Sequence, residues 1–321
     1  MSGGGLLALS AAQAANTAPK HGKALGRIAA GVPSTATPTP TLTATSVPTQ
    51  TATAAPAPTE TSTGTATPTS AATPTPTASP TTTASGISST GTEAAQALGW
   101  GPLQAGDEFD YIGAPNSTKW SVYDSAGHAG NGVRSPRAIS VNNGIMTIKG
   151  DSAGVTGGMS AKFARQKYGR YEVRMRTSAA EQQYHAVNIL WPDSTSAKCS
   201  EIDFAEQTND LANISFFLHY GCASGVQTYA KKPLDMTQWH NYAVQWCPSG
   251  VTGYVDGQLW FKDTDPAHQP DQSMHLTMQL DWFPNGQPTK PSTMDVDWAR
   301  NYSINGTGSP AAGSLASTPQ C

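Results

Sequence analysis

The sequence has little charge, no basic segment and no long apolar run. Charged residues make up 13% of the 321 residues, and the formal net charge is −3. Without a basic patch, the chain lacks the electrostatic footprint of a protein that binds nucleic acid. Because no stretch of about eighteen apolar residues occurs, the sequence also predicts no helix inserted in a membrane.

Cysteine is scarce as well, with four residues in the whole chain. None of them stands in a C-x-x-C pair, which argues against a zinc site. An even number of cysteines is compatible with disulfide bonds if the protein is exported. We therefore expect no metal ligands among the cysteines.

The first 95 residues lack the pattern of a folded domain. Residues 1–32 contain a short apolar run that ends in A-Q-A, as at a signal-peptide cleavage site, although the first basic residue is only Lys20. A disordered Ala-rich tail is the alternative. Residues 33–95 consist mainly of Thr, Pro, Ala and Ser, which predicts a disordered, extended linker. We expect a protein that is secreted or tethered to the cell surface.

From residue 96 to residue 306 the pattern changes to short runs with apolar side chains at every second position. In GRYEVRMRT, for example, Tyr171, Val173 and Met175 share one face of a strand. Turn residues separate the runs at regular spacing, which is typical of an all-β, two-sheet antiparallel sandwich. We expect one domain over residues 96–306, followed by a tail at 307–321.

The run CSEIDFAEQ, residues 199–207, concentrates acids in one predicted strand. Alternation places Glu201 and Asp203 on one face, but it sends Glu206 to the opposite face. One extra residue, accommodated as a β-bulge near Phe204 and Ala205, would return Glu206 to the first face. The spacing therefore predicts three carboxylates in a row on a bulged strand.

Three carboxylates so close together repel one another, and one of them tends to keep its proton. Retaining glycoside hydrolysis needs this asymmetry, with an ionised nucleophile and a protonated acid about 5 Å apart. Glu201 would then be the nucleophile, Glu206 the acid and Asp203 the residue that keeps their pKa values apart. An acidic strand facing solvent, or a calcium site made of carboxylate oxygens, is the structural alternative.

At these residues the sequence resembles glycoside hydrolase family 16, in which E-x-D-x-x-E is the bulged form of the signature. EIDFAE matches that form, and YGRYEVRMRT, FFLHYG, WHNYAVQWCPSGVTGYVDGQLW and MDVDWARNYSI resemble the strands around it. The resemblance covers residues 106–304. It implies a jelly roll of two packed sheets with a concave substrate cleft, and it supports the roles given to the three acids.

Substrate-binding residues follow less directly. His219 in FFLHYG matches a histidine near the acids of many relatives, and Asn188 stands where laminarinases carry an aromatic residue. For the tryptophans, a core position is an equal alternative, and Arg134 could equally be a plain surface residue. The predicted substrate-binding residues are Trp120, Arg134, Asn188, Trp191, His219 and Trp282.

The cysteines next to the acidic strand suggest a cross-link. If SEIDFAEQ and NISFFLHYG pair antiparallel, Cys199 and Cys222 fall opposite one another at the end of the ladder. We predict a disulfide bond between them. A bond from Cys247 to Cys321 would tie down the tail, but the sequence leaves it open.

Together these features predict a retaining endo-β-glycanase that acts on a β-1,3- or β-1,3/1,4-glucan. The alternatives are a transglycosylase and a non-catalytic carbohydrate-binding jelly roll. The expected partner is a β-linked polysaccharide, with no nucleic acid, and the protein is expected to be a monomer. Catalysis by two carboxylates needs no cofactor, whereas a structural calcium ion, as in many members of the family, is left open.

Overall fold

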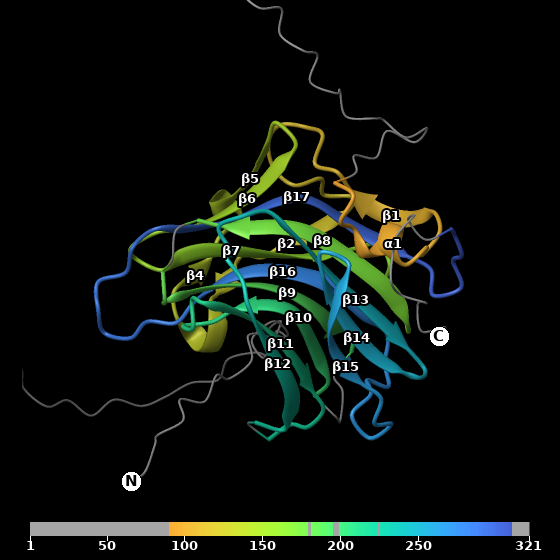
Figure 1. Cartoon of the computed structure of the whole chain (residues 1–321). Coiled ribbons are helices and arrows are strands. Elements are labelled where there is room, and N and C mark those ends of the chain that lie inside the picture. Colours follow the sequence, from red (N-terminus) through yellow and green to blue (C-terminus); the bar gives the residue numbers. More distant parts are fainter. Residues whose placement is uncertain (1–89, 179–180, 195–198, 224, 310–320) are drawn as a thin grey trace, which may run out of the picture. The chain divides into compact units, whose positions relative to one another are not determined.

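The structure is a computed structural model that describes residues 90–178, 181–194, 199–223, 225–309 and 321. The expected signal peptide and all but the last residues of the expected linker lie outside this part. The described residues form two β-sheets that are stacked face to face (Figure 1). In the described part, the helices are all too short to cross a membrane.

The two sheets contain eight and nine strands. In spatial order, the eight-stranded sheet consists of β15 (Gln258–Asp263), β14 (Gly250–Val255), β13 (His240–Cys247), β8 (Gly169–Thr177), β17 (Ser292–Tyr302), β6 (Ile145–Gly150) and β5 (Ile139–Asn142), and β1 (Leu103–Asp107) also pairs with β17. The nine-stranded sheet consists of β12 (Gln227–Pro233), β11 (Asn213–His219), β10 (Glu201–Gln207), β9 (Tyr184–Pro192), β16 (Met274–Trp282), β7 (Val155–Ala161), β4 (Val133–Arg134) and β3 (Ser125–Ala126), and β2 (Trp120–Val122) also pairs with β7.

Except for a short parallel pair between β4 and β7, these strands pair antiparallel. The helical elements are α1 (Ala94–Ala97) and two 3₁₀ turns, η1 (His128–Gly130) and η2 (Pro136–Ala138). The predicted two-sheet β-sandwich is therefore confirmed.

The alternation read from the sequence builds the core. Tyr171, Val173 and Met175 of β8 are at most 1% exposed and belong to the cluster between the sheets. The rings of Phe216 and Phe261 stack across the interface, with centroids 3.9 Å apart. Each such side chain contributes about 1.5–3 kcal/mol when it is fully buried, so this interface positions both sheets firmly.

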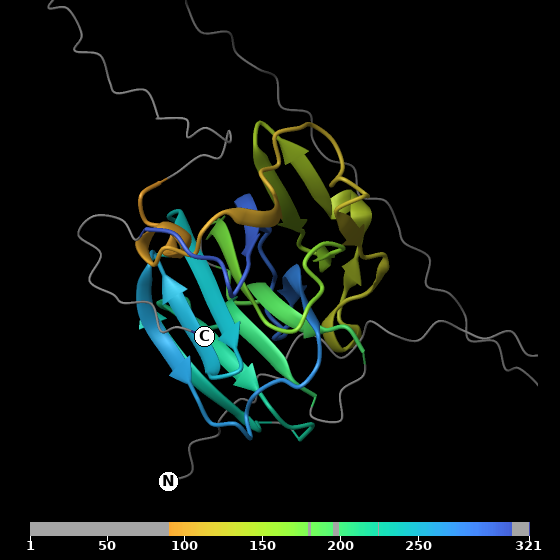
Figure 2. The same ribbon diagram turned by 90° about the vertical axis from the view of Figure 1, so that its right-hand side faces the viewer.

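The chain enters the eight-stranded sheet at its outer face, where α1 packs beside β13 and β14 (Figure 2). Ala94 and Trp100 are fully buried there, and the Trp100 ring lies 5.9 Å from that of Tyr254 in an edge contact. The buried side chains thus begin at Glu93, which is 1% exposed, a few residues before the expected start of the domain at residue 96.

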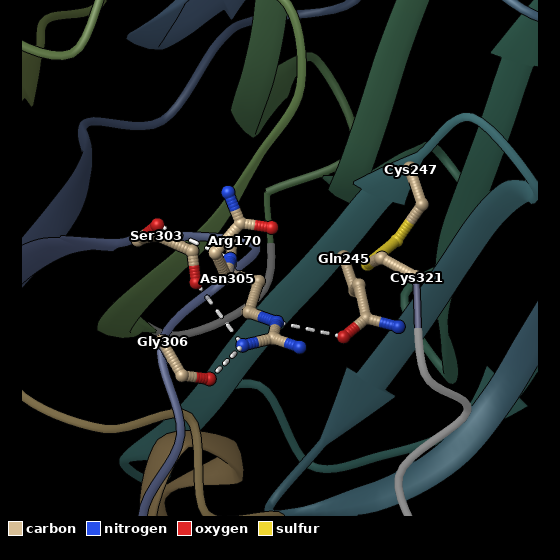
Figure 3. Close-up of a disulfide and its surroundings, with 7 residues drawn as sticks. All are labelled: Arg170, Gln245, Cys247, Ser303, Asn305, Gly306 and Cys321. Atoms are coloured by element: carbon tan, nitrogen blue, oxygen red, sulfur yellow. Dashed lines mark hydrogen bonds between the residues drawn. A yellow bond between two sulfur atoms is a disulfide. The ribbon is translucent and has the colours of Figure 1, made fainter.

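The last residue of the chain is held by a disulfide bond from Cys321 to Cys247, at the end of β13 (Figure 3). Beside it, the Arg170 guanidinium donates hydrogen bonds to Gln245 Oε1 at 2.8 Å and to the carbonyl oxygen of Ser303 at 3.1 Å. The pairing that the sequence left open is present, and all four cysteines are in disulfide bonds.

Candidate active site

Strand β10 carries the three acids, and its register changes between them. Against β11, Asp203 pairs with Phe217, but Glu206 pairs with Ser215, so one extra residue lies on β10. The ladder with β9 shifts between Asp203 and Ala205. The predicted bulge at Phe204 and Ala205 is therefore confirmed.

The bulge places the acids on the outer face of the nine-stranded sheet, which is the face turned away from the other sheet. Ile202 and Phe204, the alternating neighbours of the acids, are buried in the core between the sheets. On the outer face, Glu201 is 4% exposed and Glu206 is 6% exposed, whereas Asp203 is 1% exposed. The two outer acids keep access to solvent, while the middle acid is shielded.

Asp203 is hydrogen-bonded on both sides. Its Oδ2 lies 3.1 Å from His219 Nε2, and its carboxyl group also shares a hydrogen bond with Glu201. Burial raises the pKa of Asp203 well above its ordinary value, and the charge of Glu206 raises it further, against the hydrogen bond with Glu201. The raised pKa favours the protonated form of Asp203, and the hydrogen bond that it shares with Glu201 opposes this shift.

Glu206 faces an imidazole from the neighbouring strand. His185 Nδ1 of β9 lies 3.6 Å from Glu206 Oε1, and both side chains are nearly buried. The His185 ring stacks on Phe283, with centroids 4.1 Å apart and planes at 24°. This end of the acid row therefore has an aromatic wall.

A buried ion pair adjoins the same end of the row. Arg134 donates to Asp281 Oδ1 from Nε at 3.1 Å and from an η nitrogen at 2.6 Å, and both side chains are at most 2% exposed. Burial raises the pKa of Asp281, and the Arg134 guanidinium opposes that shift. Arg134, predicted to be a cleft residue, thus lies on the face of the acids but holds Asp281.

Two of the predicted tryptophans do not face the acids. Trp120 is 1% exposed in the main core, where its Nε1 donates to Asp107 Oδ2 at 2.8 Å. Trp282, at the end of β16, packs directly on Gly154, where any Cβ atom would collide with the ring. Its Nε1 donates to Thr289 Oγ1 at 3.1 Å. Trp120 is a packing residue, and the prediction that it binds substrate does not agree with its position.

Trp191 lies where a sugar platform is expected. It is half-buried on the outer face against Val187 and Ile189, a cluster that is separate from the main core. Because Ile202 pairs with Leu190 in the ladder, the next step along it brings Trp191 beside Glu201. Of the predicted tryptophans, Trp191 is the one that the fold brings to the acids.

Asn188 requires a correction. Alternation along β9 places it on the inner face, where it is 0% exposed and its Nδ2 lies 3.5 Å from Met175 Sδ of the opposite sheet. Asn188, which stands where laminarinases carry an aromatic residue, therefore points into the core. We no longer consider Asn188 a substrate-binding residue.

The disulfide bond between Cys199 and Cys222 is present, as predicted. It closes a loop of 23 residues between the start of β10 and the end of β11. A loop of this length corresponds to about 3 kcal/mol of stabilisation in the chain-entropy model. The bond ties the strand of Glu201 to the strand of His219.

A metal ion is conceivable only where suitable ligand atoms meet. Across the described ranges, one group of His, Cys, Asp and Glu side chains is close enough, with ligand atoms of Glu201, Asp203 and His219 within 4.8 Å of one another. Asp203 Oδ2 already contacts His219 Nε2, and burial disfavours the ionised form of Asp203 that a cation requires, so this group is a poor fit for a cation. We assign it no metal, and the question of a structural calcium ion stays open, as in the sequence analysis.

One cavity of the described part lies away from the acids. A cavity of about 900 Å³ is lined by residues of α1 and β1 together with Arg300 and Tyr302, on the other sheet. Its lining contains no residue of β10. The predicted concave cleft over the acids therefore stays a prediction.

Sequence reasoning missed His185, Asp281 and Phe283. The signal was present for the first two, because YHAVNILW and MHLTMQLDW alternate between apolar and mixed positions. The apolar set of β16 faces the core, so Asp281 had to share the outer face with the acids. Phe283 directly follows β16, and no local sequence pattern predicts that its ring stacks on His185.

Comparison with known proteins gives a consistent result. The sequence profile of the family described as "Glycosyl hydrolases family 16" matches residues 128–300, which is more than half of the chain. A β-glucanase of Rhodothermus marinus is 28% identical over 236 residues, which cover 61% of this chain and 80% of that protein. A keratan-sulfate endo-1,4-β-galactosidase of Sphingobacterium multivorum is 27% identical over 175 residues, or 48% of this chain and 41% of that protein.

Solved structures agree in fold. The laminarinase of Rhodothermus marinus superposes with a TM-score of 0.55 at 23% identity, covering 63% of this chain and 96% of that one. A non-specific endo-β-1,3(4)-glucanase superposes with a TM-score of 0.56 at 20% identity, covering 67% of this chain and 99% of that one. At this level of identity, the likeness is evidence for the jelly-roll fold alone.

Proposed function

The chain belongs to glycosyl hydrolase family 16, and on this premise we propose that it is a retaining endo-β-glycanase. The family and its β-glucanase relatives make the chain a glycoside hydrolase. The proposal adds the stereochemistry, the internal position of the cut and the linkage. We propose β-1,3- or β-1,3/1,4-glucan as the substrate.

The single observation that carries the mechanism is the bulge in β10, which aligns Glu201, Asp203 and Glu206 on one face. Glu201 attacks the anomeric carbon and forms a covalent glycosyl ester while the glycosidic bond breaks. Glu206 gives its proton to the departing oxygen. Water then enters, Glu206 takes its proton, and the hydroxide oxygen displaces Glu201 with net retention. No cofactor takes part.

Asp203 supports the nucleophile without touching substrate. Burial raises its pKa, and it holds the Glu201 carboxyl group through the hydrogen bond that the two side chains share. His219 fixes the other side of Asp203 through the contact at Oδ2. The charge is thereby concentrated on Glu201, as a nucleophile requires.

Aromatic side chains flank the acids on the neighbouring strands. Trp191 is adjacent to Glu201 on β9, and Phe217 pairs with Asp203 on β11. Beyond it, Tyr229 of β12 pairs with Phe217 and is 62% exposed. Flat apolar rings on one face support a chain of sugars, and we propose Trp191 and Tyr229 as platforms.

The two disulfide bonds support a location outside the cytosol, because such bonds persist in oxidising compartments. We propose that the protein is secreted or tethered to the cell surface. We further propose that it acts as a monomer, because the acids come from a single strand.

The test combines a substrate panel with the stereochemistry of the product. Laminarin, lichenan, agarose and galactan are incubated with the protein, and the oligosaccharides are separated by chromatography. Early proton NMR spectra should show the β-anomer first, with internal fragments rather than single sugars. First release of the α-anomer would contradict the retaining mechanism, and release of monosaccharide alone would contradict endo action.

The same products distinguish the proposed hydrolase from a transglycosylase and from a non-catalytic binding protein. A transglycosylase would yield oligosaccharides longer than the acceptor added, whereas hydrolysis yields only shorter ones. A non-catalytic carbohydrate-binding jelly roll would bind polysaccharide and release nothing. The Glu201→Gln variant gives the reference state for binding without turnover.

A further inference from the structure

His185 occupies a position that the proposed mechanism does not use. Its Nδ1 lies 3.6 Å from Glu206 Oε1, and among the described residues it has no hydrogen-bond partner. The side chain is nevertheless 6% exposed. A buried polar nitrogen without a partner destabilises the folded state, so this position needs a reason.

Packing alone does not supply that reason. The imidazole lies flat on Phe283, and a phenyl ring could do the same at no desolvation cost. On its other side, Phe283 meets the ring of His128, with centroids 4.6 Å apart, and its amide donates to the Gln183 carbonyl at 2.7 Å. Phe283 is thus held in place, and it fixes the plane of the His185 ring.

The charged groups around His185 favour an N–H directed at Glu206. Glu206 comes from β10, and Asp281 of β16 lies in the electrostatic field of both His185 and His128. Asp281 itself is engaged by Arg134 of β4. The described contact of His185 Nδ1 is therefore with Glu206, and an acceptor there selects the tautomer with the proton on Nδ1.

We propose that His185 is a positioning residue that donates its Nδ1–H to Oε1 of Glu206 and so directs the proton on Oε2 toward the leaving oxygen. In the first step, the proton passes from Glu206 Oε2 to the glycosidic oxygen, while the electrons of the broken bond stay on that oxygen. His185 keeps its own proton throughout. The contact is longer than a hydrogen bond, as catalytic contacts often are before substrate binds.

This inference rests on the proposed function of Glu206, and it makes a selective prediction. A residue that positions the acid matters most when the leaving group needs a proton. With a poor leaving group, general acid catalysis contributes about 10²- to 10⁴-fold. With a 2,4-dinitrophenolate leaving group, protonation contributes little, so the orientation of Glu206 matters little.

The experiment compares three variants by kcat/KM, which reports the first bond-breaking step. His185→Phe keeps the stack on Phe283 but removes the donor, and His185→Gln restores an N–H donor. His128→Phe is the matched control, because it alters the other ring on Phe283 without a recorded contact to Glu206. The substrates are laminarin and the 4-methylphenyl and 2,4-dinitrophenyl β-glycosides of laminaritriose.

We expect His185→Phe to lose about 10- to 100-fold on laminarin and on the 4-methylphenyl glycoside, and far less on the 2,4-dinitrophenyl glycoside. His185→Gln should recover part of the loss, and the control should change all three substrates equally and slightly. If His185→Phe lowers kcat/KM equally on both aryl glycosides, or on neither, the inference about His185 is wrong. The proposed function is not affected by that result. If His185→Phe does not fold, His185→Leu, which also lacks an N–H donor, takes its place, and equal losses on both aryl glycosides again overturn the inference. A wild-type protein that cleaves none of the substrates would overturn the proposed function and the inference with it.

Discussion

The outer faces of both sheets carry acidic side chains, but the groups that surround these acids differ between the two sheets. On the eight-stranded sheet, acids are matched by guanidinium groups or backbone N–H groups. The pairs are Arg174 with Asp297 at 3.0 Å, Arg176 with Asp295 at 3.1 Å and Arg300 with Glu108 at 2.7 Å. Glu172 accepts hydrogen bonds from the backbone N–H groups of Ala94 at 2.6 Å and Ala95 at 3.2 Å.

On the nine-stranded sheet, the three acids of β10 lie next to one another on one face of the strand. Their recorded ion pairs are with imidazoles, between Asp203 and His219 and between Glu206 and His185. The guanidinium group of this region, that of Arg134, is bound to Asp281 instead. Burial raises the pKa of Asp203, and the repulsion from Glu206, which no guanidinium group offsets, raises it further.

This contrast distinguishes acids that hold an element of the fold in place from acids that take part in chemistry. A matched pair holds an element in place, as Glu172 holds α1 on β8. Like charges brought together destabilise the fold, and such perturbed clusters occur where chemistry requires them. Removal of one carboxylate should therefore change mainly activity on the nine-stranded sheet and mainly the pH dependence of stability on the eight-stranded sheet.

The largest expected effect is that of Glu201→Gln on activity. Loss of the nucleophile should lower kcat on the preferred polysaccharide by at least about 10⁴-fold. The melting temperature should stay the same or rise, because the variant no longer buries an ionised carboxylate beside two other carboxyl groups. Steady-state kinetics and thermal unfolding monitored by circular dichroism measure both. A lower melting temperature together with activity near that of wild type would contradict the distinction between the two faces.

Glu172→Gln is the matched change on the other face, and it should alter stability rather than activity. Burial raises the pKa of Glu172 to about 8, well above the ordinary value of a glutamate side chain. The folded state therefore binds the proton more tightly, so the free energy of unfolding is highest below pH 4.5 and falls as pH rises toward 8. The slope is about 1 kcal/mol per pH unit.

In Glu172→Gln this slope should disappear, which leaves the variant more stable than wild type above pH 8. Urea unfolding at several pH values gives the difference between the two proteins. An unchanged slope would show that Glu172 is ionised in the folded state. Polysaccharide hydrolysis by the variant serves as the control and should match wild type.

Asp203 should show an intermediate effect. Asp203→Ala removes the donor to Glu201 and should lower kcat by about 10²- to 10³-fold. Asp203→Asn keeps an N–H donor and should recover part of that loss. Because burial raises the pKa of Asp203, activity of the wild type should fall when this proton is lost at alkaline pH, and the Asn variant should lack that fall. Equal activity of the two variants would exclude the hydrogen bond as the cause.

The smallest effect concerns the matched pairs themselves. Arg300→Met leaves Glu108 without its guanidinium partner, and the Arg300 side chain is 2% exposed. Because Glu108 is 23% exposed, the expected cost is about 2 kcal/mol rather than that of a fully buried pair. Arg176→Met is the control, since Arg176 is 43% exposed and such pairs contribute about 1 kcal/mol or less. Equal losses in urea unfolding would remove the distinction between the two pairs.

Much of the site was accessible from local spacing. The two-then-three interval of Glu201, Asp203 and Glu206 predicts the bulge, and antiparallel pairing of the flanking strands predicts the Cys199–Cys222 bond. Both predictions depend on residues close together in the sequence. The alternation in β8 likewise predicts which side chains face inward.

Predictions for isolated side chains were less successful. Trp120 looked like a loop aromatic, but its strand places it in the core, where Asp107 accepts its N–H. The resemblance to laminarinases places Asn188 where they carry an aromatic residue, although alternation in YHAVNILW places it with Ala186 and Leu190 on the inner face. Strand alternation is the better guide at this position.

The sequence by itself determined the two-sheet class, the bulged acidic strand and the disulfide bond beside it, because each depends on periodicity or on neighbouring strands. Only the tertiary structure decided which groups face the acids. His185 comes from β9, Asp281 from β16 and Arg134 from β4, and no local pattern measures the distance between them. Their approach follows from the strand order β10-β9-β16-β7-β4, which long-range pairing sets and which a stretch of sequence does not contain.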